Sequence, residues 1–383
     1  MKILYITTTI DQNDYKDFVK IWKKHPNPSN QNFHNKLIRA LSLTNEVEVL
    51  SIRPFSSKMC TVKRLEKENK EIDGIKWHYL TCKANKLLRI STIIKEYKTF
   101  SKQNELKDYV VLTDTINPSC LKASTYIAKK HKLPLIGICT DSPSNITGTS
   151  RSYTLYLLTK AKKCNGFIAL TNELKELYID EDKKPSLVFE GIVEDTKDIK
   201  PYKGDKPYFY FGGSLLPRYG VFDLINAFKK IDNKDVDLYI AGHTGNMSQL
   251  QKEIKENENI KYLGTIDVRD VLSYEKGAIA NINPRPYSQD LDRFSIPSKT
   301  IEYLSSGRVV ISVKNTKLQK IFDKEIIWIN SSNEQDLLEA MNKVLLMDEK
   351  ERKNLGEDAL TKVMSVYSFK EINKKIIHFL TNF

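Results

Sequence analysis

The feature that most constrains the fold is an alternation of short strand-like runs with longer helix-like runs, which occurs twice along the chain. In the first series the strand-like runs are KILYITTT, EVEVLSI, KWHYLTC, YVVLTDT, LPLIGICT and GFIALT. Helical patterns such as NFHNKLIRALSL and LKASTYIAKKHK separate several of these runs. Alternation of this kind predicts a parallel sheet with helices on both faces.

The alternation weakens near residue 200, in the charged segment EGIVEDTKDIKPYKGDKP, which is typical of a linker. It starts again with YFYFGG, VDLYIAG, IKYLGT, AIANINP, RVVISV and IIWINS, and the chain is helical from about Asn333. A length of 383 residues exceeds what one compact core usually accommodates. We therefore expect an α/β protein of two doubly wound, Rossmann-like domains, residues 1–200 and 201–383. Ligands would bind in a cleft at the carboxyl ends of the strands, and the final helices would pack back toward the N-terminal domain.

The composition excludes several classes of protein. Hydrophobic residues make up 40% and charged residues 28% of the chain, which is ordinary for a globular protein. No run of eighteen apolar residues predicts a membrane span. The first ten residues, MKILYITTTI, read as a strand and not as a signal peptide. The five cysteines include no CxxC pair, so we expect neither a zinc site nor disulfides, and a cytoplasmic location.

The net charge of +13 is concentrated in the first half of the chain. Residues 1–200 contain 34 Lys and Arg against 23 Asp and Glu, whereas residues 201–383 contain 27 against 25. This excess indicates either a solvated surface or a contact with an anionic partner, for example a membrane. No nucleic-acid-binding motif accompanies the charge, so nucleic acid is not an expected partner.

Two segments of the first half combine apolar stripes with lysines. Residues 15–25 and 83–102 each predict an amphipathic helix. The simpler interpretation is a pair of ordinary helices packed on a sheet. The alternative is a basic amphipathic surface that docks on the inner face of an anionic membrane. The stripe residues are Tyr15, Phe18, Val19 and Trp22 in the first segment and Leu87, Ile90, Ile94 and Tyr97 in the second.

The stretch RFSIPSKTIEYLSSGRVVIS, residues 293–312, predicts a turn, a short helix and a buried strand. We expect Ser298 to cap the helix directly after Pro297, within a residue or two. The free N–H groups at a helix start favour a phosphate, and Lys299 adds a positive charge there. One turn further, the Glu302 carboxylate can accept hydrogen bonds from the two adjacent hydroxyls of a ribose. The spacing therefore predicts a site for a nucleoside diphosphate.

Loops after the other strands of the second domain supply further candidates for donor binding. Gly212 and Gly213 allow close approach to the backbone, and Arg218 places a positive charge before a helix, as a phosphate site requires. A glycine turn of this kind is a weak indication by itself. The remaining candidates are Ser214 directly after the two glycines, His243 after the second strand, Thr265 after the third, and Arg285 in a long polar loop.

In these motifs the second half resembles the retaining glycosyltransferases of GT-B fold known as glycosyl transferases group 1. Glu302 corresponds to the second of two glutamates in the family motif, and Gly307 to its terminal glycine. The PSKxxEYLxxG form is similar to that of capsule and exopolysaccharide enzymes. Residues 166–194 also resemble the end of the family's first domain.

The resemblance implies metal-independent transfer of a hexosyl group from a nucleotide-sugar, with UDP as the first expectation, to a hydroxyl of a glycan or polyprenyl-linked acceptor. The anomeric configuration would be retained, the setting would be the synthesis of bacterial surface polysaccharide or glycoconjugates, and no cofactor would be needed. Arg218 and Lys299 would stabilise the departing diphosphate. Asp141, in DSPSN after a strand, lies near the place where the family has a histidine or acid that contacts the sugar or the acceptor. An Asp that only caps a turn is the simpler alternative for this residue.

The sequence departs from the family at three charged positions. The first glutamate position falls on Phe294, the arginine after the glycine turn falls on Ser214, and the usual lysine falls near Tyr219. Two alternatives to a transferase therefore stay open: an inactive GT-B subunit that binds a partner, and a nucleotide-sugar epimerase. The charged residues available as substitutes are Arg218, Arg285, Lys299, Arg293, Asp290 and Asp292.

Overall fold

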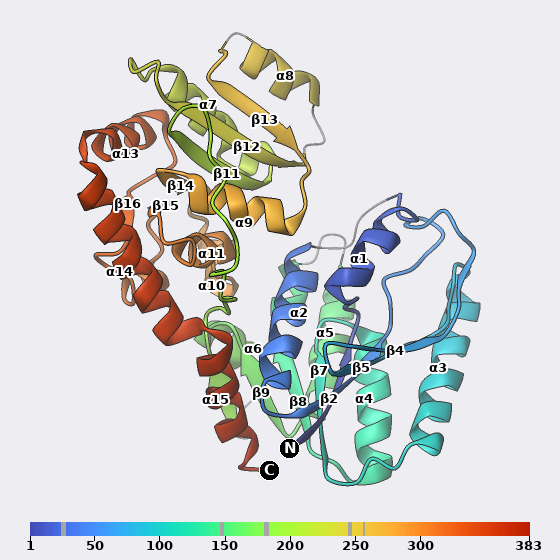
Figure 1. Ribbon diagram of the computed structural model, residues 1–383. Helices are drawn as coiled ribbons and strands as arrows, with labels where there is room; N and C mark the ends of the chain where they lie inside the picture. Colours follow the sequence, from blue (N-terminus) through green and yellow to red (C-terminus); the bar gives the residue numbers. More distant parts are fainter. Residues whose placement is uncertain (24–27, 146–148, 180–183, 244–246, 256) are drawn as a thin grey trace. The chain divides into compact units, whose positions relative to one another are not determined.

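The computed structural model describes residues 1–23, 28–145, 149–179, 184–243, 247–255 and 257–383 (Figure 1). The chain forms two compact units. The first contains residues 1–192, 293–295 and 369–383, and the second contains residues 193–292 and 296–368. Each unit is a parallel sheet between helices, which confirms the expected α/β class with two Rossmann-like domains.

The first unit contains an eight-stranded sheet in the order β10-β9-β8-β7-β1-β2-β5-β4. All neighbours pair in parallel except β4 and β5, which form an antiparallel hairpin. Each of the six expected strand-like runs forms a strand. The strands are β1 (Lys2–Thr7), β2 (Glu46–Ser51), β4 (Glu68–Ile72), β5 (Ile75–Tyr79), β7 (Tyr109–Asp114), β8 (Leu135–Cys139), β9 (Gly166–Ala169) and β10 (Ser186–Val188), while β3 (Arg64–Leu65) and β6 (Cys82–Lys83) pair separately.

Helices cover both faces of this sheet. Buried side chains of α3, α4, α5 and α6 share one hydrophobic core with Leu4 and Ile6 of β1. On the opposite face, Tyr5 of β1 hydrogen bonds to His34 of α2, and α15 packs beside α2 (Figure 1). The helices are α1 (Gln12–Val19), α2 (Pro28–Ser42), α3 (Lys86–Gln103), α4 (Pro118–His131), η1 (Pro143–Asn145), α5 (Arg151–Ala161), α6 (Asn172–Tyr178) and α15 (Phe369–Leu380).

The second unit contains a fully parallel sheet in the order β13-β12-β11-β14-β15-β16. This is the Rossmann order 3-2-1-4-5-6, in which the strand order reverses between the first and fourth strands. Here the reversal lies between β11 and β14, so a ligand crevice is expected at the carboxyl ends of these two strands. The strands are β11 (Tyr208–Ser214), β12 (Asp237–His243), β13 (Ile260–Gly264), β14 (Ala280–Asn283), β15 (Val309–Val313) and β16 (Ile327–Ile329).

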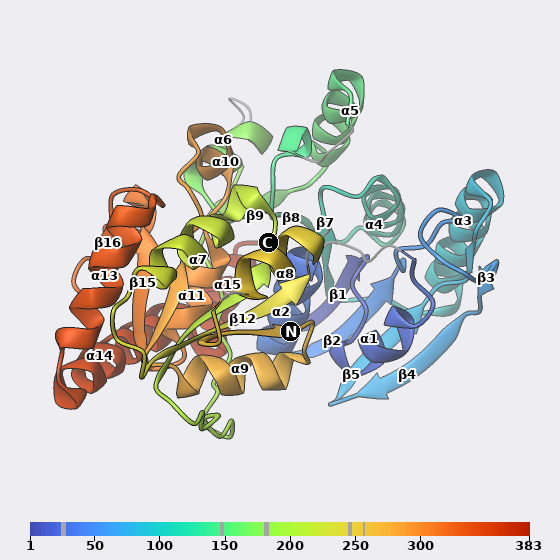
Figure 2. The ribbon, with the colours of Figure 1, turned by 90° about the horizontal axis from the view of Figure 1, so that it is seen from above.

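The two faces of β11 have different chemistry. Phe209 and Phe211 pack in a core with α7 and α13, whereas Tyr208 and Tyr210 face the Tyr274 ring of α9. In Figure 2 the helices and strands of this unit can be followed from above. Its helices are η2 (Pro217–Tyr219), α7 (Val221–Lys229), α8 (Met247–Lys255), α9 (Val268–Gly277), α11 (Ser298–Leu304), α12 (Thr316–Gln319), α13 (Glu334–Leu346) and α14 (Glu349–Tyr367), and α10 (Gln289–Phe294) ends in residues that group with the first unit.

The two amphipathic segments differ in how much apolar surface they bury. Trp22 is buried, and Phe18 contacts both Trp22 and Tyr79, so these two side chains of the first stripe pack inward, while the Val19 side chain lies outside the described part of the structure. In α3, Ile93, Tyr97 and Phe100 are buried, as expected for a helix on a sheet. The first turn of α3 does not follow this pattern, because Leu87 and Leu88 are 77% and 52% exposed. Among the described residues, no helix is both long enough and apolar enough to cross a membrane.

Candidate functional site

The glycine turn at the end of β11 packs tightly against α11 and the end of β12. The Tyr303 hydroxyl of α11 accepts a hydrogen bond from the Gly212 N–H at 2.9 Å and lies 3.2 Å from the Gly212 carbonyl oxygen. A Cβ atom at Gly242 of β12 would lie 1.7 Å from the Gly213 carbonyl oxygen. A Cβ atom at Gly213 itself would meet only Phe211, at 3.7 Å. The turn therefore has a fixed backbone with one accessible position, Gly213, at the strand-order reversal.

Three predicted donor-binding residues lie along the same edge of the sheet. Ser214 and His243 are register partners at the ends of β11 and β12, and the Leu215 N–H donates to the His243 carbonyl at 3.0 Å. Thr265 is exposed directly after Gly264, which ends β13. The structure thus brings Ser214 and His243 beside the glycine turn and places Thr265 one strand further out.

Arg218 is exposed on η2, within the connection from β11 to α7. Its guanidinium lies 5.1 Å from the centre of the Tyr219 ring and donates a hydrogen bond to the Tyr219 hydroxyl at 3.4 Å. Tyr219 occupies the region where the family has its usual lysine. Tyr219 carries no charge itself, but its ring and hydroxyl hold the Arg218 guanidinium in position.

Arg285 is held inside its own loop. Its Nη2 atom donates to Asp292 Oδ1 at 3.0 Å, and Asp292 Oδ2 accepts from the Ser288 N–H at 2.8 Å. Because Asp292 is only 7% exposed, this pair closes the loop after β14. The other proposed acid, Asp290, has a side chain outside the described part of the structure.

The short helix α11 begins one residue earlier than expected. Its N-cap is Pro297 and not Ser298, and Pro297 makes no side-chain capping bond. Ser298 is instead the first helical residue and is exposed. The Thr300 hydroxyl accepts from Asn283 Nδ2 of β14 at 2.8 Å, so α11 is tied to the strand beside the glycine turn.

Lys299 lies between two carboxylates. Its Nζ atom is 3.1 Å from Glu302 Oε2 and 3.8 Å from Oε1 of Glu275, on α9. Burial alone would lower the pKa of Lys299, but the carboxylates of Glu302 and Glu275 outweigh it and raise the pKa above its usual value. The ammonium group therefore stays charged and holds Glu302 in place.

Sequence reasoning missed Glu275 and Tyr303. The Glu275 side chain is only 1% exposed, although it belongs to the segment SYEKG, which reads as the polar end of a surface helix. The distance between Glu275 and Lys299 depends on how α9 packs against α11, and the local sequence of neither helix predicts that packing. Tyr303 directly follows Glu302 and could have been suspected as a brace for the helix.

Asp141 belongs to the first unit, in the loop after β8. Its Oδ1 atom accepts from the Ser142 N–H at 2.8 Å and from Asn145 Nδ2 at 3.0 Å. These bonds match the simpler interpretation of an Asp that organises a turn. They also fix the direction in which the half-buried carboxyl group points.

Phe294 and Arg293 also group with the first unit. Phe294 packs against the core that contains the α3–α6 side chains, and the Arg293 guanidinium lies 5.1 Å from the centre of the Phe294 ring. Among the residues with described positions, no group of three or more His, Cys, Asp or Glu side chains is arranged to hold a metal ion.

Comparison with known proteins places these elements in a family. The family described as glycosyl transferases group 1 matches residues 193–362, which contain the whole crevice of the second unit. The second unit is a group 1 glycosyltransferase domain. No curated protein matches the chain significantly in sequence.

Solved structures extend the likeness in fold to the whole chain. Sucrose-phosphate synthase from Thermosynechococcus elongatus is 13% identical, with 100% of this chain and 99% of that chain covered and a TM-score of 0.69. The UDP-forming α,α-trehalose-phosphate synthase of Burkholderia xenovorans, in complex with glucose-6-phosphate, is 9% identical over 100% of both chains, with a TM-score of 0.70. Anabaena HepE, in complex with UDP, is 13% identical over 100% of both chains, with a TM-score of 0.64. At these identities the comparison shows the fold alone, and it confirms the expected GT-B arrangement of two Rossmann-like domains.

Proposed function

We propose that the protein transfers a hexosyl group from a UDP-sugar to a hydroxyl of a glycan or lipid-linked acceptor, with retention of configuration. The observation that carries the proposal is the bond between Tyr303 and Gly212 in a group 1 glycosyltransferase domain. This bond joins the glycine turn to α11, the helix that contains Glu302. A diphosphate at the turn and a ribose at Glu302 would therefore contact two elements that are held in a fixed position relative to each other. The HepE complex with UDP supports uridine as the base.

Each predicted donor contact has a role in this proposal. The Gly213 and Ser214 backbone and the Arg218 guanidinium bind the diphosphate, together with the start of α11, where Pro297 is buried and Ser298 is exposed. Glu302 accepts from the ribose hydroxyls, and Lys299 acts through Glu302. The polar groups at the edge of the sheet, His243 and Thr265, contact the sugar and the base, and Arg285 shapes the loop beside them.

The proposed reaction breaks the bond between the anomeric carbon and the diphosphate and forms a bond to the acceptor oxygen on the same face. The acceptor hydroxyl gives its proton to the leaving phosphate oxygen, so no enzymic nucleophile is needed. Arg218 and the backbone N–H groups stabilise the negative charge that develops on the diphosphate. Asp141 orients the transferred sugar or the acceptor. Cationic side chains take the role of a metal, and the product enters a bacterial surface polysaccharide such as a capsule.

A donor screen tests this proposal. We expect UDP release from a UDP-sugar that depends on a glycan acceptor and is unchanged by EDTA. Arg218→Gln should lower kcat at least tenfold, whereas Arg269→Gln, a change at an exposed arginine of α9, should not. Nucleotide binding without turnover by any donor would favour the inactive subunit, and a changed sugar still attached to UDP would favour the epimerase.

We further propose that the cytoplasmic enzyme works at an anionic membrane surface through the start of α3. Asn85 caps this helix by accepting from the Leu87 and Leu88 N–H groups at 3.0 and 3.2 Å, which fixes both exposed leucines. Ile90, at 38% exposure, extends the apolar patch. The basic residues around it are Lys83, Lys86, Lys95 and Lys98. Apolar side chains with a basic rim are the combination that binds anionic lipid surfaces.

Sedimentation with vesicles tests the membrane proposal. The protein should pellet with vesicles of phosphatidylglycerol and phosphatidylcholine, and less so with phosphatidylcholine alone or at high salt. The double change Leu87→Ser/Leu88→Ser should weaken binding at least tenfold (about 1.4 kcal/mol). Leu346→Ser, at an 87% exposed leucine of the second unit, is the matched control. Equal binding by wild type and the double variant would exclude α3 as the contact.

A further inference from the structure

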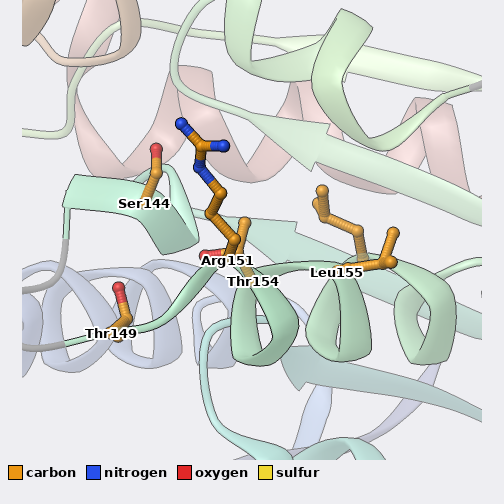
Figure 3. Close-up of a pocket in the computed structure, with 6 residues that line it drawn as sticks. Ser144, Thr149, Arg151, Thr154 and Leu155 are labelled. Carbon is orange, nitrogen blue, oxygen red and sulfur yellow. The ribbon is translucent and has the colours of Figure 1, made fainter.

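A groove in the first unit lies between η1 and α5, close to Asp141 in the sequence. It has a volume of about 350 Å³ and is lined by Ser144, Thr149, Arg151, Thr154, Leu155 and Leu158 (Figure 3). This volume is at the lower end of the range for small-molecule sites, about 300–1,000 Å³. None of the lining residues is among the donor-binding candidates, and we call this groove the α5 groove.

The α5 groove has one polar end and one apolar end. Four of its residues, Arg151, Thr154, Leu155 and Leu158, are spaced i, i+3, i+4 and i+7 and therefore share one face of α5. Figure 3 shows the polar ends of Ser144 and Arg151 pointing the same way, with Leu155 further along the helix. The Ser144 hydroxyl and the Arg151 guanidinium therefore lie at one end of the groove, and Leu155 lies toward the other end.

The exposure of the apolar end is the unusual feature. Leu155 is 65% exposed, although Leu157 and Ala161 of the same helix are fully buried in the core. The Arg151 guanidinium makes no ion pair with any described acid, so its charge is available to a ligand. A planar guanidinium matches phosphate oxygens bidentately, and the leucines match a hydrocarbon chain.

The polar end also connects to the Asp141 loop. The Ser144 hydroxyl lies 2.7 Å from the Ser142 hydroxyl, and Asn145 of the same short helix donates to Asp141 Oδ1 at 3.0 Å. One wall of the groove is therefore the segment that orients Asp141. A ligand in the groove would therefore contact the short helix whose Asn145 holds the Asp141 carboxyl group.

We infer that the α5 groove binds a lipid phosphate, with the phosphate at Arg151 and Ser144 and the hydrocarbon chain along Leu155 and Leu158, while the Thr149 hydroxyl donates to the Pro143 carbonyl at 3.0 Å and forms part of the wall. This inference deepens the proposed function and rests on it in one respect: the lipid phosphate is the anchor of the acceptor whose hydroxyl Asp141 orients. Binding of the lipid phosphate itself needs only the groove.

Calorimetric titration of the full chain with three ligands tests the inference. The ligands are octyl phosphate below its critical micelle concentration, inorganic phosphate, and neutral octyl glucoside. We expect octyl phosphate to bind at least tenfold more tightly than either of the others. Arg151→Gln should weaken octyl phosphate at least tenfold, and Leu155→Ser about fivefold. Both side chains are exposed, so both variants should fold, which their melting curves will show.

Matched controls separate the groove from general effects. Leu346→Ser and Arg269→Gln change exposed residues of the second unit and should leave octyl phosphate binding unaltered. Equal affinity for inorganic phosphate with no effect of Leu155→Ser would overturn the inference in favour of a free-phosphate site. Equal affinity for octyl glucoside, or no effect of Arg151→Gln, would overturn it in favour of a plain apolar patch.

A parallel titration with UDP distinguishes this inference from the proposed function. UDP affinity should be the same in wild type and Arg151→Gln. If octyl phosphate binds as expected and UDP does not bind, sugar transfer from UDP fails as a function, while the lipid-phosphate site stands. If UDP binds and octyl phosphate does not, the reverse holds.

Discussion

At the scale of single residues, the most informative group is the charge cluster of Lys299, Glu302 and Glu275, in which Glu275 is buried and the other two side chains are 33% and 18% exposed. A buried ion pair is costly to form and much more costly to break on one side, because the remaining charge is left uncompensated. Lys299 is the cation that the structure places between both carboxylates, at 3.1 and 3.8 Å. We therefore expect it to act as a positioning residue for Glu302 more than as a direct phosphate ligand.

This account predicts how substitutions in the cluster combine. Lys299→Met should lower the free energy of unfolding by about 3 kcal/mol, because two carboxylates then face each other with no cation. Adding Glu275→Gln to that variant should restore at least about 1 kcal/mol, a coupling that urea denaturation of the four proteins in the cycle would measure. Additive effects of the two changes would show that Lys299 and Glu275 do not interact.

A second buried pair, in the first unit, makes stability depend on pH. Asp114 ends β7 and is fully buried, and burial raises the pKa of its carboxyl group to about 7. His34 Nε2 lies 3.7 Å away, and burial lowers the pKa of this imidazole to about 3. Both groups are therefore neutral in the folded protein near pH 5.

The shift in the pKa of Asp114 predicts a pH-dependent variant. Because the folded pKa is raised above the ordinary 3.8, this carboxyl group costs no stability below pH 3.8 and reduces stability progressively as the pH rises to about 7. Asp114→Asn should therefore stabilise the protein at pH 8 by about 2–4 kcal/mol and hardly at all at pH 4. The buried, neutral His34 imidazole adds a contribution of the opposite sign, which is present above pH 6.5 and is lost as the pH falls toward 3. A difference that stays constant from pH 4 to pH 8 would contradict the raised pKa.

At the scale of elements, the crevice depends on how closely β11 and β12 approach at their ends. Gly242 has φ +141°, and a Cβ atom there would lie 1.7 Å from the Gly213 carbonyl oxygen. Gly264, at the end of the next strand, also has a positive φ of +72° but has open space around it. A comparison of substitutions at Gly242 and Gly264 therefore distinguishes the free-energy cost of a positive φ angle from the cost of the close contact with Gly213.

We predict that Gly242→Ala destabilises the protein by about 3 kcal/mol or more, because the glycine turn must move, whereas Gly264→Ala costs about 1 kcal/mol of backbone strain. Thermal or urea unfolding of both variants gives the comparison. UDP affinity should fall in Gly242→Ala and stay unchanged in Gly264→Ala. Equal destabilisation of the two variants would mean that the contact with Gly213 is not tight.

The sequence was sufficient to predict most strands of both sheets, but not the hairpin at one edge of the first sheet or the exposure of the first turn of α3. Alternating apolar runs identify β11 and its neighbours because each strand is buried on both faces. The hairpin of β4 and β5 was missed, although its Asp73-Gly74 turn has the positive φ angles of 51° and 75° that such a dipeptide favours. The exposure of the first turn of α3 could not be predicted. Its apolar residues belong to the same stripe as those in the buried part of the helix, so the sequence does not show where burial begins.

The candidate site was predictable where function depends on local sequence and not where it depends on packing between elements. Gly213, Ser214 and His243 follow strands whose carboxyl ends share one edge, so their proximity follows from a parallel sheet. The ion pairs of Arg285 with Asp292 and of Lys299 with Glu275 join separate elements, and no spacing rule indicates them. These pairs change the expected role of both cations.

At the scale of the whole molecule, the chain does not divide into two consecutive halves. The helix α15, from the end of the chain, belongs to the first unit, where Asn373 Nδ2 donates to the Thr44 hydroxyl at 2.8 Å and the Arg39 guanidinium lies 5.7 Å from the centre of the Phe369 ring. Residues 193–200 belong to the second unit, in which Lys276 Nζ donates to the Thr196 carbonyl at 2.7 Å. Experiments on the donor site are therefore best made on the full chain.

The most direct test of the central claim is calorimetric titration of the full chain with UDP, GDP and ADP, for wild type and for Glu302→Ala. We predict micromolar binding of UDP, weakened at least tenfold (about 1.4 kcal/mol) by the substitution and unchanged by Glu349→Ala, a control at an exposed glutamate of α14. Binding by none of the three nucleotides, or binding that does not respond to Glu302→Ala, would contradict a donor site at the crevice of the second unit.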